Sequence, residues 1–193
     1  MDVTVVNQNK TRNKINPQKF GLLVACASMT MMFLGFMSAY IVREAAGNWY
    51  EFPLPNMFFI SAGVILLSSV VLHGSYRAFL RKNEAMYKGL MVLGFVLGIA
   101  FVVLQYMGWL QMQEMGLELT TNPSTSFIYV ISFIHAAHVI AGIGVLVVAL
   151  VHAFALNLRV TARRKLRFEM TLIFWHFVDF LWIVLLIFFT LNK

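Results

Sequence analysis

The sequence predicts an all-α membrane protein, a bundle of five transmembrane helices. Of its 193 residues, 60% are hydrophobic and only 12% are charged, whereas roughly a quarter of the residues in a soluble domain carry charge. The apolar residues fall into five continuous blocks, each long enough to cross a hydrocarbon core about 30 Å thick. The blocks show no two-residue alternation, so helices are expected to span the membrane and strands are not.

The blocks also define how the chain is organised. Residues 1–19 are polar and basic without a signal-like apolar segment, and they are expected to form a cytoplasmic tail. Residues 20–193 are expected to form a single transmembrane domain, because no connection is long enough for a soluble one. Turn-forming residues precede the fourth block, where Ser124 or Thr125 is expected to cap the helix. The five predicted spans are about 20–42, 54–76, 89–110, 126–154 and 168–191.

The distribution of charge predicts the orientation of the helices. Lys and Arg concentrate before the first block, between the second and third, and between the fourth and fifth, while the other two loops are acidic or neutral. Because short cytoplasmic loops are enriched in Lys and Arg, the N-terminus is expected inside and the C-terminus outside. The net charge of +7 is then explained by topology and anionic headgroups, and nucleic acid is not expected as a partner. Arg77 and Arg81 at the inner end, and Trp49 at the outer rim, are candidate headgroup contacts.

Small residues and the single cysteine indicate helix packing. Cys26 lies inside the first block and is interpreted as a packing residue, since one cysteine forms no internal disulfide. Gly94 and Gly98 match a GxxxG pattern in the third block. That pattern is common in apolar helices, so ordinary contact between neighbouring helices is the favoured interpretation.

The polar residues deep within the blocks form the candidate site. An Asp in mid-membrane costs about 2.5–3.5 kcal/mol on insertion scales, so Asp179 is expected to pair with a donor in the bundle or on another subunit. Helical periodicity places the two histidines of the fourth helix on one face, and a polar stripe on the fifth helix could meet it. The candidate residues are His135, His138, Trp175, His176, Asp179 and Trp182.

Three interpretations of these side chains compete. They could bind a metal, since imidazole and carboxylate suit Zn, Fe or Mn, but neither helix carries an ExxH or HExxH motif. They could form a proton or substrate relay, but the first three helices contribute no comparable group and no interrupted helix pair is evident. We favour the third interpretation, in which they are structural side chains that lock helices together or dock a partner subunit.

The fifth block contains Trp175-His176-Phe177-Val178-Asp179 followed by Trp182, which resembles the WHFVDxxW signature of subunit III of haem-copper respiratory oxidases. The segment from His135 to Gly142 resembles that family's HxxHVxxG segment, and Ser124-Thr125-Ser126-Phe127 resembles the loop before it. The first block resembles the family stretch ASE…F…AY…R, through Ala27-Ser28, Phe33, Ala39-Tyr40 and Arg43. The resemblance extends over all five helices and is to the short five-helix bacterial form. Met29 stands where many members carry a glutamate, so no role of that acid is carried over.

The resemblance implies a non-catalytic subunit of a terminal oxidase, in the first place cytochrome c oxidase, which reduces O2 to water in aerobic respiration and translocates protons. Such a subunit packs on subunit I in a complex with subunit II, binds phospholipids, and supports proton uptake and stability during turnover. Haems and copper are expected in subunits I and II, and no catalytic, cofactor or metal residue is expected in this chain. Its expected location is the bacterial inner membrane, with a larger respiratory supercomplex as a further candidate partner.

Two groups of alternatives stay open. Within the family, subunit III of a quinol oxidase and a homologue associated with nitric oxide reductase look similar to this chain. The electron donor is recognised by subunits I and II, so the sequence of this subunit does not identify it. Outside it, the chain could be a free-standing membrane transporter or metalloenzyme.

Overall fold

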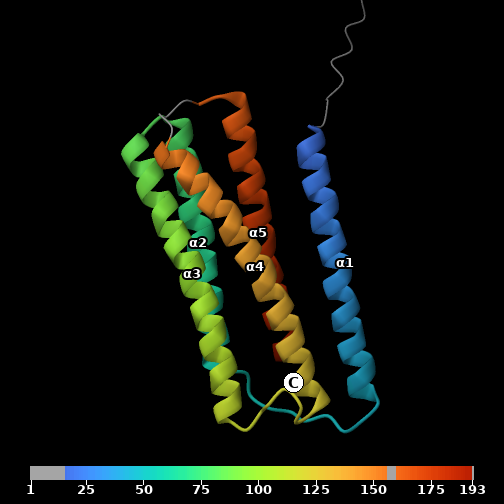
Figure 1. The fold of residues 1–193 in the computed structure, drawn as a ribbon. Coiled ribbons are helices and arrows are strands. Elements are labelled where there is room, and N and C mark those ends of the chain that lie inside the picture. Colours follow the sequence, from blue (N-terminus) through green and yellow to red (C-terminus); the bar gives the residue numbers. More distant parts are fainter. Residues whose placement is uncertain (1–15, 156–159, 193) are drawn as a thin grey trace, which may run out of the picture.

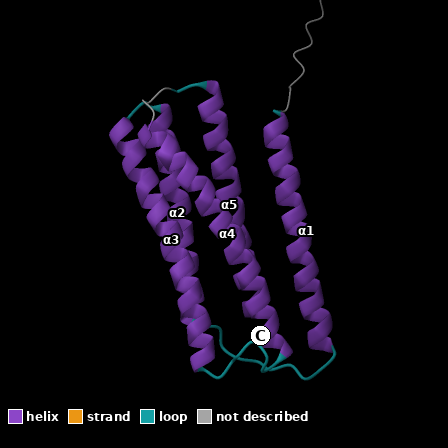
Figure 2. Cartoon of the chain, in the orientation of Figure 1, coloured by secondary structure: helices purple, strands orange, loops and turns teal. Residues whose placement is uncertain are grey.

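Five α-helices and no strand make up the part of the chain that the computed structural model describes, residues 16–155 and 160–192. Each helix is long and apolar enough to cross a membrane, so the predicted all-α fold with five membrane-spanning helices is confirmed (Figure 2). The helices are α1 (Pro17–Ala45), α2 (Asn56–Leu80), α3 (Glu84–Glu114), α4 (Pro123–Ala155) and α5 (Ala162–Leu191).

The helices run past most ends of the apolar blocks because polar side chains cap them outside the apolar segments. Asn16 accepts from the backbone N of Gln18, Asn83 from Met86, and Thr161 from Arg164. Pro17–Lys19, expected in the tail, therefore belong to α1, while residues 1–15 of that tail lie outside the described residues. Helices of 25 to 33 residues are about 38–50 Å long, so they tilt or extend into the headgroup region.

The start of α4 differs from the prediction. The helix begins at Pro123, and Oδ1 of Asn122 accepts from the backbone N of Ser124 at 3.0 Å. The expectation that Ser124 or Thr125 caps this helix is thus wrong, since both lie in its first turn and proline favours the first helical position. The hydroxyl of Ser124 donates to the carbonyl O of Tyr50 at 2.9 Å and so joins the first turn of α4 to the loop between α1 and α2.

The helices alternate in direction, which sorts the loops between two ends (Figure 1). The start of α1, the α2–α3 connection, the end of α4 and the start of α5 lie at one end, which we call the basic end after its Lys and Arg residues. The other two loops and the C-terminus lie at the opposite end, the aromatic end. Contacts are most extensive between α2 and α3, whereas α1 packs only against α4 and α5 in the described part of the chain.

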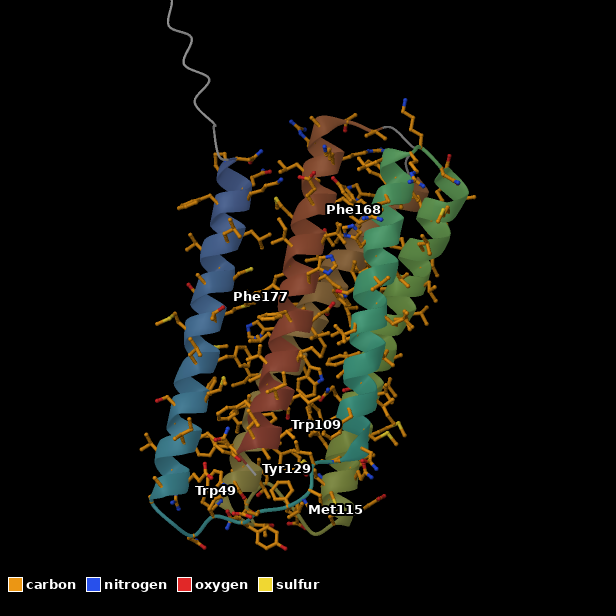
Figure 3. The ribbon with its side chains drawn as sticks, turned by 180° about the vertical axis from the view of Figure 1, so that it is seen from behind. Trp49, Trp109, Met115, Tyr129, Phe168 and Phe177 are labelled. Carbon is orange, nitrogen blue, oxygen red and sulfur yellow. The ribbon has the colours of Figure 1, made fainter. Side chains whose placement is uncertain are left out.

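Aromatic side chains gather at the aromatic end, where Figure 3 labels Trp49, Trp109 and Tyr129. The indole of Trp109 donates to the hydroxyl of Ser132 at 2.9 Å, and the hydroxyl of Tyr129 donates to the carbonyl O of Leu117 at 3.1 Å. These bonds connect α3, the loop after it and α4. Tryptophan and tyrosine with satisfied polar tips are typical of a membrane–water interface.

Three glycines of α3 allow close contact with neighbouring helices. A Cβ atom at Gly98 would lie 2.7 Å from Cη2 of Trp175, and one at Gly94 would lie 2.5 Å from Cδ2 of Leu72. Gly108 is in equally close contact with the ring of Phe58. The GxxxG pair therefore serves two different contacts, one with α2 and one with α5.

Candidate functional site

One aromatic ring from each of the five helices forms a layer through the bundle, which we call the aromatic layer: Phe33, Phe58, Phe101, His135 and Trp182. The imidazole of His135 stacks on Trp182 with ring centroids 5.1 Å apart and an interplanar angle of 25°. Phe33 and Phe101 meet the same imidazole edge-on at 6.3 and 6.0 Å, and Phe58 meets Trp182 edge-on at 5.7 Å. Such pairs contribute about 0.5–1.5 kcal/mol each beyond area burial.

His135 acts in this layer as an aromatic ring without polar partners among the described residues. Its side chain is fully buried, and neither ring nitrogen has a hydrogen-bond partner there. The neighbouring His138 is half-buried, with Nδ1 2.7 Å from the carbonyl O of Ile134 and its ring edge-on to Phe33 at 5.8 Å. The two histidines share a helix face as expected, and their contacts are those of packed side chains.

His135→Phe is expected to leave the folded bundle intact or to stabilise it by about 1 kcal/mol, because the ring stack is kept and two buried nitrogens without a partner among the described residues are removed. His135→Ala removes the ring and is expected to destabilise the bundle by about 2–4 kcal/mol through the cavity left behind. Unfolding in mixed micelles measures both. A loss of stability in His135→Phe as large as in His135→Ala would mean that the nitrogens bind something essential.

A second group of polar side chains joins α2 to α5, and we call it the α2–α5 polar cluster: Ser69, His73, His176 and Asp179. The hydroxyl of Ser69 donates to Oδ2 of Asp179 and lies 2.6 Å from Nδ1 of His176. Since a hydroxyl has one proton, the serine that donates to Asp179 accepts from His176. Asp179 is 2% exposed, and its Oδ1 has no partner in the described chain. The exposed His73 lies beside His176, with ring centroids 6.1 Å apart.

The geometry of the α2–α5 polar cluster differs from that of a catalytic triad. In a catalytic Ser-His-Asp triad the histidine lies between the other two groups, whereas here the serine does. Asp179 thus has a donor inside the bundle, as expected. Sequence analysis missed Ser69 and His73, since a serine in an apolar helix carries no distinctive signal and His73 lies near the end of its block.

The polar faces of α4 and α5 meet only in part. The tryptophans of the α5 stripe contact α4, Trp182 by stacking on His135 and Trp175 by packing at 3.3 Å from the position of a Cβ on Gly142. Asp179 is directed to α2 instead, through Ser69. The imidazole of His135 and the carboxylate of Asp179 therefore belong to separate groups.

An ion cluster at the basic end joins three helices. Glu169 of α5 accepts from the hydroxyl of Tyr76 on α2 at 2.7 Å and pairs with Lys19 of α1. Lys165 lies one turn before Glu169, with Nζ and Oε1 3.9 Å apart. Sequence analysis did not single out Glu169, although its i, i+4 spacing from Lys165 was a usable signal.

Glu169→Gln is expected to loosen the basic end of α1 while costing at most about 1 kcal/mol of stability, since the pairs are partly exposed. Spin labels at Gln18 and Met170 would report the change as a broader distance distribution. Lys88→Met, which removes a surface pair with Glu84 on one helix, is the matched control. An unchanged distribution in Glu169→Gln would show that α1 is held by its apolar contacts alone.

The candidate headgroup residues lie near the two ends. Arg77 and Arg81 are exposed at the basic end of α2. Trp49 is half-buried at the aromatic end, where its ring packs edge-on against Tyr40 at 4.6 Å. Cys26 is buried in α1, as expected for a packing residue.

No group of three or more His, Cys, Asp or Glu side chains suited to a metal ion occurs within residues 16–155 and 160–192. The chemistry these residues display is hydrogen bonding and ring packing between helices. Together the fold and its embedded polar groups define a multi-pass α-helical membrane protein.

Comparison with known proteins identifies the family. The family model for cytochrome c oxidase subunit III matches residues 5–191. Proteins named cytochrome c oxidase subunit 3 are similar to the chain, among them those of Synechocystis sp. at 28% identity, Osphranter robustus at 26% and Gallus gallus at 25%. The matches cover 87%, 86% and 86% of this chain and 72%, 66% and 66% of the relatives, so the chain spans about two thirds of their length.

The chain therefore belongs to the cytochrome c oxidase subunit III family, as its motifs indicated.

Proposed function

We propose that this chain is a non-catalytic subunit III of a haem-copper terminal oxidase, with cytochrome c oxidase as the first assignment. It packs on subunit I, in a complex that includes subunit II, and it supports proton uptake and stability during O2 reduction. The observation that carries the proposal is the family match over residues 5–191. The packed state of the embedded side chains supports a structural role, because His135 lies among rings and Asp179 bonds to a neighbouring helix.

Purification of the tagged chain from its native membrane in mild detergent tests this proposal. The expected result is co-purification with larger haem-containing subunits, and a reduced-minus-oxidised haem spectrum that scales with them. The chain separated from those subunits is expected to show no haem absorbance. A chain that purifies alone, with its own metal and activity, would favour the free-standing transporter or metalloenzyme.

The electron donor separates the alternatives within the family. We assign cytochrome c because the family model and the similar proteins carry that name. Oxygen consumption by the purified complex with reduced cytochrome c, compared with a quinol, tests the assignment. Activity with the quinol alone would identify a quinol oxidase subunit, and nitric oxide reduction would identify the third alternative.

The basic end is assigned to the cytoplasmic face of the bacterial inner membrane, which places the N-terminus inside and the C-terminus outside. The observation that supports this orientation is that the basic loops gather at one end of the bundle (Figure 1). Arg77 and Arg81 then contact headgroups of the inner leaflet and Trp49 those of the outer leaflet. Labelling of single cysteines in the two sets of loops with an impermeant reagent tests the orientation in whole cells.

A further inference from the structure

Two rows of buried side chains run along α2, and each row repeats every seven residues. The first row is large and apolar and consists of Phe58, Ile65, Leu72 and Phe79. The second row is small and polar and consists of Ser61, Ser68 and Ser75. All seven side chains are at most 2% exposed. Steps that alternate between three and four residues in this way are the pattern of a coiled coil.

Helix α3 carries the matching pattern. Its buried residues follow the same alternation from Tyr87 to Met112, and three of them are glycines. The large row of α2 packs against this face, with Phe58 on Gly108 and Leu72 on Gly94. These contacts advance by equal numbers of residues in opposite directions along the two helices. The two helices therefore meet as an antiparallel coiled coil in which large side chains fill the spaces above glycines.

The serine row adds hydrogen bonds to the same contact. Ser68 donates to the carbonyl O of Gly94 at 3.1 Å, and Ser75 donates to that of Tyr87 at 2.9 Å. The third serine, Ser61, accepts from a side-chain amide of α3 at 2.9 Å. All three bonds join α2 to α3. Interhelical bonds of this kind stabilise helix pairs in lipid, where the hydrophobic effect does not drive association.

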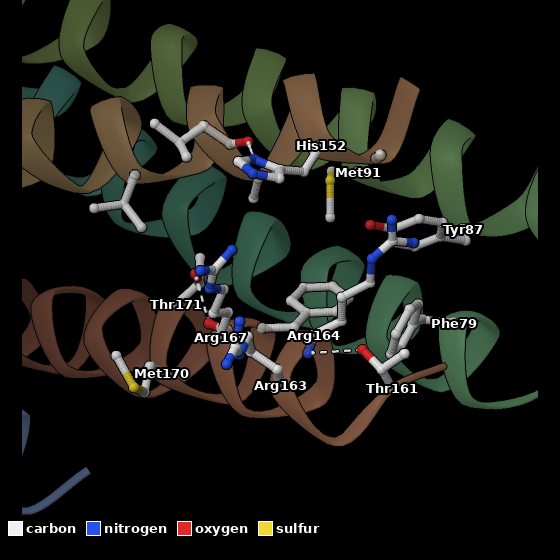
Figure 4. Close-up of a pocket in the computed structure, with 15 residues that line it drawn as sticks. Phe79, Tyr87, Met91, His152, Thr161, Arg163, Arg164, Arg167, Met170 and Thr171 are labelled. Carbon is white, nitrogen blue, oxygen red and sulfur yellow. Dashed lines mark hydrogen bonds between the residues drawn. The ribbon is translucent and has the colours of Figure 1, made fainter. Parts of the chain in front are cut away.

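The connection at the basic end closes this helix pair without help from another helix. The backbone N of Asn83 donates to the carbonyl O of Ala78 at 3.1 Å, and its side chain caps α3 by accepting from Met86. The rings of Phe79 and Tyr87 flank the connection, with centroids 5.4 Å apart. Figure 4 shows both rings at the wall of a pocket of about 470 Å³ that α4 and α5 also line.

We propose that α2 and α3 form a coiled-coil hairpin that is stable by itself in the membrane, and that α4 and α5 pack onto this preformed hairpin. The tryptophans of α5 lie against its surface, Trp175 on Gly98 and Trp182 edge-on to Phe58 and Phe101. Helix α1 has no packing contact with the hairpin in the described chain. This order of assembly follows from contacts within the chain and is independent of the proposed function.

Spin labels on the full chain in mixed micelles test the proposal as the fraction of SDS is raised. A pair at Ile60 and Met107, both exposed, reports the end of the hairpin far from its connection. A pair at Val96 of α3 and Ile140 of α4, also exposed, reports the docking of α4. The distance between Val96 and Ile140 is expected to broaden at a lower SDS fraction than the distance within the hairpin. Coincident transitions, or earlier opening of the hairpin, would overturn the proposal.

The double variant Ser68→Ala/Ser75→Ala tests the source of the stability. The ratio of closed to open hairpin is expected to fall about tenfold, because two interhelical bonds are lost. The SDS fraction at which α4 separates is expected to stay unchanged, since the states before and after that step both contain the closed hairpin. A shift of that step as large as the shift of the hairpin would show that the helices form one cooperative unit.

The matched control is Ser28→Ala/Ser38→Ala, which makes the same chemical change at two exposed positions of α1. Neither transition is expected to move in this variant. A loss of hairpin stability equal to that of Ser68→Ala/Ser75→Ala would mean that the buried serine row does not stabilise the hairpin, and it would overturn the proposal.

Discussion

Gly98→Leu is expected to destabilise the folded subunit by about 3 kcal/mol, which is the upper part of the range for overpacked cores. The first added atom would lie 2.7 Å from Cη2 of Trp175, whose indole is fully buried. Helices α3 and α5 would therefore move apart, and Trp175 would lose its close contact with Gly142. Unfolding in mixed micelles, together with the yield of assembled complex, measures the effect.

Gly144→Leu is the control for that experiment, because a Cβ at Gly144 meets no atom within 4 Å. Both changes replace glycine by a better helix former, which alone is worth up to about 1 kcal/mol in favour of the variant. The difference between them thus isolates the steric contact. If Gly98→Leu were as stable as Gly144→Leu, α3 and α5 would not be as close as described.

Ser69→Ala is expected to cost about 2–3 kcal/mol of stability, because it removes the hydrogen-bond donor that the described residues supply to the buried carboxyl group of Asp179. Asp179→Leu is expected to cost less, since Ser69 keeps His176 as a partner. Unfolding in mixed micelles gives both values, and the complex purified from each variant shows whether association with subunit I follows the loss of local packing.

The double variant Ser69→Ala/Asp179→Leu completes this cycle. Replacing both partners by apolar groups is nearly neutral in many cores, so the double variant is expected to recover most of the stability lost in Ser69→Ala. Costs that simply add would show that Ser69 and Asp179 do not interact in the folded protein.

The number of membrane-spanning segments and their helical form were predictable from the sequence. In a bilayer the backbone polar groups of a long apolar segment must be hydrogen-bonded within the segment, and a helix achieves this. The helix ends were less so, since they depend on capping side chains beyond the apolar core. Asn16 and Thr161, for example, extend α1 and α5 past their blocks by three and six residues. The hydropathy of a segment carries no information about one capping hydrogen bond, so it does not predict where the helix begins.

The candidate site was predictable within a helix and much less so between helices. The spacing of His176 and Asp179 placed them together, and the structure has both bonded to the same hydroxyl. That hydroxyl belongs to Ser69, more than a hundred residues away in the chain, and the choice of that serine depends on how α2 is rotated against α5. Rotation is set by packing, here by glycines that admit Leu72 and Phe58 against α3.

The aromatic layer also bears on the order in which the protein is made. Phe33 precedes the rest of its layer in the chain, yet its layer partner His135 is on α4, and α1 has no packing contact with α2 or α3 in the described chain. The α2–α3 hairpin can close as soon as both helices have been inserted. During synthesis α1 is therefore expected to stay in lipid or beside the insertion machinery until the ribosome has delivered α4 and α5, so that α1 packs later than the α2–α3 hairpin that follows it in the chain.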